Sequence, residues 1–199
     1  MPRSDQTGVS AASIPRVSVG WIHPFLEILD EAGVQPGEIL ERANLPTLAV
    51  DDGALLGPWN PWIREPRFGK PVWELVKAVA SKPLLPAPVR EVAILVTGSH
   101  FRSGYELYAH VLVAEQRGLS DEKLATIVAG QRPVDLTRQE AVAYDMASAL
   151  VSGGVLPELT YRAAVKEFGE HGAAELSYLV GVYCMVSVTL NTFDVPVPD

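Results

Sequence analysis

The chain has 199 residues, 48% apolar and 20% charged, which is typical of a globular domain with a buried core. Its formal net charge of −8 argues against nucleic acid as a partner. The sequence has no uninterrupted apolar run of about 18 residues and no apolar segment near its start, so we expect neither a membrane span nor a secretory signal. The single cysteine, Cys184, excludes an intramolecular disulfide, and we therefore expect a cytoplasmic protein.

The N-terminal part of the chain is predicted to be irregular. Residues 1–20 are polar and non-periodic, as in a flexible arm or a strap ordered by a partner subunit. Short helices are expected at Pro24–Glu31 and Gly37–Arg42. The stretch Gly53–Lys70 is rich in proline and glycine, and we expect a loop whose aromatic residues, Trp59 among them, pack onto the domain.

From Pro71 onward the apolar residues recur with helical spacing. We expect residues 21–199 to form a single all-α domain with its core at about 70–195. The last segment is almost wholly apolar, and its length of about twenty residues favours a buried helix over a strand. The expected helices span Pro71–Ser81, Val89–Phe101, Tyr105–Arg117, Asp121–Ala129, Arg138–Val151, Pro157–Phe168 and Ala173–Phe193.

Two segments of the chain resemble each other. Residues 91–96 and 175–180 align at a shift of 84, and the same shift places Ser103 on Ser187. A duplicated helical hairpin would give this pattern. The second copy has apolar or unrelated residues where the first has its polar cluster, so we expect it to supply core.

The polar cluster lies in Arg90–Gly118. In a helix that starts at Ser103, the side chains of Ser103, Glu106 and His110 share one face beside an apolar stripe. Glu91 lies nineteen residues before His110 and is expected to approach it from the preceding helix. Polar groups at the edge of a core are costly unless they bond one another or serve a pocket.

Structural roles are the alternatives for each member of the cluster. His110 is either an acid–base group or a half-buried histidine with its bonds satisfied. Glu106 is either a pocket residue or a solvated helix residue, and Glu91 either meets His110 or pairs with a nearby arginine. Ser103 is expected to bond the helix N-terminus and not to act as a nucleophile, because no nucleophile-elbow motif surrounds it.

The segment resembles the signature region of the carboxymuconolactone decarboxylase and alkylhydroperoxidase D superfamily. The peroxidase branch carries a glutamate, a Cys-x-x-Cys pair and a histidine, which fall here on Glu91, on Ser103 and Glu106, and on His110. Neither cysteine is present, so the thiol–disulfide mechanism does not carry over. Further stretches that are similar to a decarboxylase-like branch are 57–62, 90–96, 105–110, 118–120, 175–181 and 190–193.

The resemblance implies an all-α, alkylhydroperoxidase D-like bundle that assembles as trimers or hexamers. It also implies a lyase that needs no cofactor and protonates the carbon from which a carboxylate has left, acting on a small lactone or carboxylic acid. The predicted catalytic residues are His110, Glu106, Glu91 and Tyr105. The predicted substrate-binding residues are His100, Arg102, Ser103, Trp59 and Arg64, with an arginine holding the substrate acid.

Two other functions are compatible with the same scaffold. One is hydroperoxide reduction, which would require Cys184 to be exposed and acidic. The other is a non-catalytic oligomeric binding protein. An isomerase or hydratase would be a variant of the lyase, since all of them transfer protons. We expect no metal site, because His100 and His110 lack metal-ligand spacing.

Overall fold

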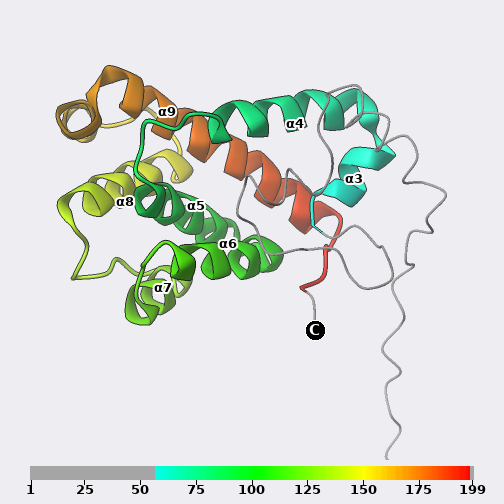
Figure 1. Ribbon diagram of the computed structural model, residues 1–199, viewed down its shortest axis with the longest axis horizontal. Coiled ribbons are helices and arrows are strands. Elements are labelled where there is room, and N and C mark those ends of the chain that lie inside the picture. The colour runs from blue at the N-terminus through cyan, green and yellow to red at the C-terminus, as the bar shows by residue number, and fades with distance from the viewer. Residues whose placement is uncertain (1–56, 198–199) are drawn as a thin grey trace, which may run out of the picture.

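The computed structural model describes residues 57–197, and within them the regular structure is helical, with no strand (Figure 1). The predicted all-α class is therefore confirmed. The expected arm at residues 1–20 and the expected helices at 24–31 and 37–42 lie outside the described residues. The described helices are α3 (Trp59–Arg64), α4 (Pro66–Ala80), α5 (Ala87–Phe101), α6 (Gly104–Gln116), α7 (Asp121–Val128), α8 (Arg138–Val151) and α9 (Glu158–Thr192).

The prediction of a loop over Gly53–Lys70 is wrong for its second half. Two helices form there, because the prolines sit where a helix tolerates them: Pro58 is the N-cap of α3, and Pro66 begins α4. The N–H that proline lacks would have no intrahelical hydrogen-bond partner in the first turn of a helix. Pro71, expected to open a helix, lies inside α4.

Helices α5 and α6 form a hairpin whose turn decides the geometry of the polar cluster. Arg102 ends α5 in the left-handed region, at φ 51°, and the Ser103 N–H donates to the Gly98 carbonyl at 2.9 Å. The chain reverses there, so residues at similar distances before and after the turn lie side by side. Glu91 and His110 meet this condition.

Helix α9 runs through the middle of the bundle (Figure 1) and contacts α4, α5, α6 and α8. It bends at Gly169, whose φ of 73° is easy for glycine only. This break separates the two helices expected at 157–168 and 173–193. By length and composition α9 would pass as a membrane span, and 44% of its most apolar 18-residue window is buried in the bundle.

Two apolar clusters make up the described core. The larger joins α5, α8 and α9, and includes Leu95, Met146 and Leu176. The smaller is aromatic and joins α3, α4, α6 and the C-terminal part of α9, with Trp62, Trp73 and Tyr105 as members. Tyr183, on α9, packs against both clusters, so the boundary between them falls beside the polar residues of α5 and α6.

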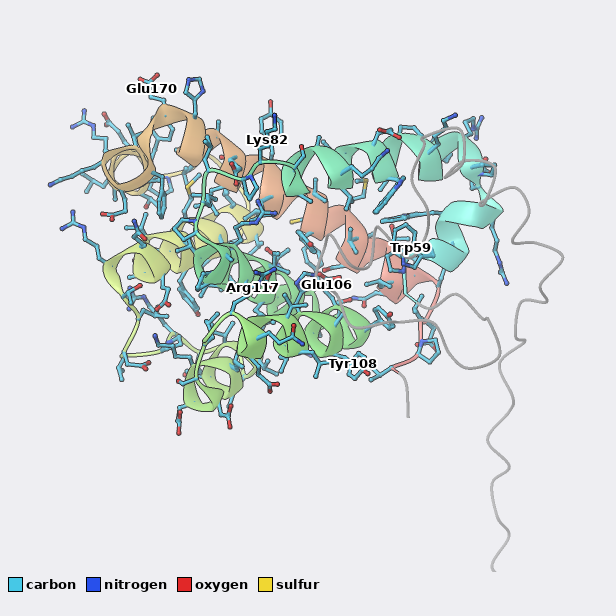
Figure 2. All side chains as sticks on the ribbon, in the orientation of Figure 1. Trp59, Lys82, Glu106, Tyr108, Arg117 and Glu170 are labelled. Carbon is cyan, nitrogen blue, oxygen red and sulfur yellow. The ribbon has the colours of Figure 1, made fainter. Side chains whose placement is uncertain are left out.

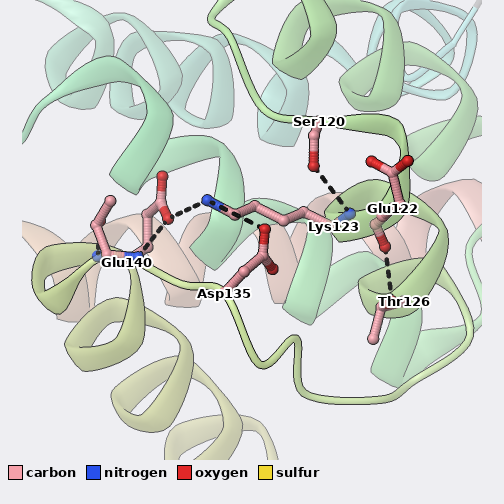
Figure 3. A network of polar contacts seen from close by, with 7 residues as sticks. Ser120, Glu122, Lys123, Thr126, Asp135 and Glu140 are labelled. Atoms are coloured by element: carbon pink, nitrogen blue, oxygen red, sulfur yellow. Dashed lines mark hydrogen bonds and ion pairs between the residues drawn. The ribbon is translucent and has the colours of Figure 1, made fainter.

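The connection from α7 to α8 is held by a polar network (Figure 3). The predicted capping box is present: Thr137 accepts from the Glu140 N–H, and Glu140 accepts from the Thr137 N–H at 2.8 Å. The same carboxylate accepts from Lys123 at 2.9 Å. The Lys123–Glu140 contact therefore links α7 to the start of α8.

Candidate active site

The α5–α6 hairpin brings a histidine between two glutamates. His110 Nδ1 lies 2.8 Å from Glu91 Oε2, which approaches from α5 as expected. On the other side, His110 Nε2 lies 3.2 Å from Glu106 Oε1, one turn earlier on α6. That second pair lacks hydrogen-bond alignment, and Glu106 Oε1 has no other partner. The edge of the imidazole meets Tyr183 of α9, with ring centroids 4.9 Å apart.

The three residues are largely removed from water. The side chains of Glu91, Glu106 and His110 are 10%, 5% and 12% exposed. Figure 2 shows Glu106 in the middle of the bundle, whereas Lys82 and Glu170 lie at its edge. Each added or removed proton therefore changes the energy of this cluster strongly.

Burial, together with the nearby Glu91 carboxylate, raises the pKa of Glu106 to about 7, although His110 opposes the shift. Burial alone would lower the pKa of His110, but the Glu106 and Glu91 carboxylates outweigh it, and the pKa is raised above its ordinary value. Near neutral pH the Glu106–His110 pair therefore holds a proton that either group can carry. Such a pair can act as an acid and as a base in one reaction cycle.

Glu91 takes the orienting role in this arrangement. Its oxygen accepts the proton on His110 Nδ1, which leaves Nε2 directed at Glu106. The alternative that Glu91 pairs with Arg90 is not what the structure shows. Arg90 binds Glu175 of α9 at 3.0 Å and the Val79 carbonyl at 2.8 Å.

Several buried polar groups near the cluster have no hydrogen-bond partner. Ser103 was expected to bond the N-terminus of α6, but its side chain makes no capping bond and is wholly buried. Tyr105 is buried in the aromatic cluster beside Gly57, and burial raises the pKa of its phenol, as do the nearby Tyr108 and Glu106. The atoms without a partner are Ser103 Oγ, Tyr105 Oη, Glu106 Oε1, Ser187 Oγ and Trp73 Nε1.

The other predicted substrate-binding residues lie away from the cluster. His100, Arg102 and Arg64 are exposed at the ends of α5 and α3. Trp59 stacks edge-on against Trp62 and Trp73 and belongs to the aromatic cluster. The structure thus brings none of these three charged side chains to His110, because the turn at Arg102 directs the end of α5 to the surface.

One residue that contacts the histidine escaped the sequence analysis, Tyr183 on α9. It appears in the sequence only as a member of an apolar run. Ser187, which aligns with Ser103 in the internal similarity, is wholly buried, as expected of a second copy that supplies core. Tyr183 reaches His110 by packing between segments about 70 residues apart in the chain, which periodicity does not report.

Cys184 is half-buried on α9, and burial raises the pKa of its thiol. A raised pKa lowers the thiolate fraction that would attack a peroxide. Among residues 57–197, no group of three or more histidine, cysteine, aspartate or glutamate side chains is placed to hold a metal ion.

The arrangement of these helices defines an alkylhydroperoxidase D-like fold, as the sequence predicts. A solved structure with this arrangement is a cysteine-to-alanine variant of the debrominase Bmp8 in complex with 2,3,4-tribromopyrrole. It aligns with a TM-score of 0.69 and 10% sequence identity, over 95% of this chain and 93% of that chain. Searches of family models and of curated proteins find no match to the sequence.

Proposed function

We propose that this chain is a cofactor-free acid–base enzyme, a decarboxylase-like lyase acting on a small lactone or carboxylic acid. The observation that carries the proposal is the buried imidazole of His110 between the Glu91 and Glu106 carboxylates. A histidine with a purely structural role has a hydrogen-bond partner at each ring nitrogen. Here Nε2 of His110 faces Glu106 Oε1 without forming a hydrogen bond, and that oxygen has no other partner. The matching fold, in an enzyme that holds a small ring compound, is compatible with this proposal.

The proposed reaction breaks the bond between the substrate carbon and its carboxylate. Carbon dioxide leaves, and the electron pair of that bond passes to the carbonyl, through the conjugated double bond in an unsaturated lactone, as an enolate. The Glu106–His110 pair then delivers its proton to a carbon of this enolate, and the next substrate or solvent restores the proton. Glu91 keeps the imidazole oriented and stabilises its positive charge throughout.

The test follows the proton that arrives at the carbon. Wild type and His110→Gln are given carboxymuconolactone in D2O, and product formation and deuterium content are measured by NMR. We expect the wild type to release product labelled at one carbon, and His110→Gln to be slower by about 10²–10⁴-fold. His171→Gln, at an exposed histidine, is the control. A folded His110→Gln protein with full activity would refute the role of His110.

A further inference from the structure

Four buried oxygens without hydrogen-bond partners lie at the start of α6 and on α9. They are Ser103 Oγ, Tyr105 Oη, Glu106 Oε1 and Ser187 Oγ. Ser103 and Ser187 are 0% exposed and Glu106 is 4% exposed. A buried hydroxyl without a partner costs about 1–3 kcal/mol, so two wholly buried serines of this kind are unusual unless they bind something.

The register between the helices places Ser187 opposite the start of α6. Tyr183 meets His110, and Asn191 donates to the Phe101 carbonyl at 2.8 Å. Ser187 is one turn from each of these residues and on the same face of α9. The α5–α6 segment between the same two contacts contains Ser103 and Glu106.

The hydroxyl of Ser187 behaves differently from others on its helix. Ser177, Thr189 and Thr192 donate to the carbonyl four residues earlier, at 3.0, 2.8 and 2.7 Å. This local bond is the usual way for a helical hydroxyl to be satisfied. Ser187 makes no such bond, so its hydrogen-bonding capacity remains for a group between α9 and α6.

Charge around the serines restricts the group that would bind there. Glu91 and Glu106 are carboxylates, and Arg90, the nearest arginine in sequence, is held by Glu175. A lasting negative charge on the group that the serines bind would be strongly disfavoured there, whereas the carboxylate that is cleaved leaves as neutral carbon dioxide. A neutral carbonyl oxygen accepts two hydroxyl hydrogen bonds without that cost.

We propose that Ser103 and Ser187 together bind one carbonyl oxygen of a lactone or ketone substrate. This inference rests on the proposed function and deepens it, since it names the substrate group and its two donors. The carbon next to the bound carbonyl then lies beside Glu106 and His110. The two hydrogen bonds strengthen as negative charge develops on that oxygen in the enolate.

Binding is tested separately from turnover with two small probes, γ-crotonolactone and crotonate, by ligand-observed NMR titration. We expect wild type to bind the lactone saturably and the carboxylate more weakly. Ser187→Ala and Ser103→Ala should each weaken lactone binding by about three- to tenfold, the loss of one hydrogen bond. Ser177→Ala, whose hydroxyl bonds its own helix, is the matched control.

If Ser103 and Ser187 have only a structural role, the same variants give different results. If the serines only hold water, Ser187→Ala changes the melting temperature and leaves lactone affinity as in wild type, which overturns the proposal. Absence of saturable lactone binding to wild type overturns it too. We expect Ser187→Ala to melt no lower than wild type, because an unpartnered hydroxyl is removed.

Failure of the proposed function is distinguishable from failure of this inference. His110→Gln should bind γ-crotonolactone within about twofold of wild type while losing turnover, because the imidazole donates no bond to the carbonyl oxygen. Full activity in that variant, with weakened lactone binding in Ser187→Ala, refutes the role of His110 and keeps the carbonyl site. Lost activity in His110→Gln with unchanged lactone binding in both serine variants supports the role of His110 and refutes the carbonyl site.

Discussion

At the scale of single residues, the chemistry depends on removing Glu106 from water. A carboxyl on a solvated helix face would be ionised at neutral pH and would serve only as a base. Glu106 is buried beside Glu91, and its pKa rises to about 7. Its proton is therefore available near neutral pH, which a general acid requires.

The same burial predicts a dependence of stability on pH. Folding takes up a proton at Glu106 between its ordinary pKa of 4.5 and its folded value of about 7. The free energy of unfolding therefore falls as the pH rises through this window, by on the order of 1–3 kcal/mol. The raised pKa of His110 has the same sign, since its contribution is complete below the unfolded pKa and is lost above it.

Glu106→Gln should remove the first of these contributions, because glutamine does not titrate. Urea unfolding at pH 5 and pH 8 measures the difference for wild type, for Glu106→Gln and for the exposed control Glu115→Gln. We expect the control to keep the wild-type difference and Glu106→Gln to show a smaller one. An unchanged difference in Glu106→Gln would mean that this carboxyl is ionised normally.

At the scale of elements, the close approach of α5 to α6 depends on Gly98. A Cβ at this position would lie 3.2 Å from Glu106 Cγ and 3.3 Å from Leu107 Cδ2. These contacts are tighter than normal packing, so Glu106 would have to move. A Cβ added to Gly181, within α9, would have no atom within 4 Å, so Gly181 offers a matched comparison.

Gly181→Ala should stabilise the protein by about 0.5–1 kcal/mol, the helix preference of alanine over glycine. Gly98→Ala should lose this gain to crowding, and should also slow product formation because Glu106 is displaced from His110. Urea unfolding and the D2O assay measure the two effects. Equal stabilisation by both changes, with full activity, would contradict a positioning role for Gly98.

Helix α9 is tied to the α4–α5 connection by Glu175. Its carboxylate accepts from the Leu84 N–H at 2.7 Å and from Arg90 at 3.0 Å, and both charged side chains are mostly buried. Glu175→Ala should cost about 2–4 kcal/mol of unfolding free energy, because Arg90 would be left buried without its carboxylate.

The pair of Arg138 and Glu167 gives the comparison, because Arg138 is 69% exposed although Glu167 is 17% exposed. Glu167→Ala should cost about 0–1 kcal/mol. The two variants are compared by urea unfolding at one salt concentration. A cost for Glu175→Ala no greater than that for Glu167→Ala would show that the Glu175 contacts do not hold α9 in place.

At the scale of the whole molecule, we propose self-association. The resemblance to the decarboxylase-like family implies trimers or hexamers, and the described surface carries exposed apolar side chains on α9 and on the α4–α5 connection, such as Tyr178 and Leu84. Native mass spectrometry and light scattering should give three or six times the chain mass. A stable monomer at micromolar concentration would contradict the proposal.

The sequence by itself determined the helical class, most helix positions after residue 71 and the spacing of Glu91, Glu106 and His110. Periodicity and capping are local, so Thr137 and Glu140 form the expected box. The sequence did not determine the helices at 59–70, because prolines occur both where helices end and where they begin.

Only the tertiary structure decided which charges meet. Arg90 binds Glu175, Arg102 is exposed, and Tyr183 of α9 packs against His110. These pairings depend on the register between helices distant in the chain, and many registers bury similar apolar area. The choice among them comes from packing of the whole core, which no short segment of the sequence contains.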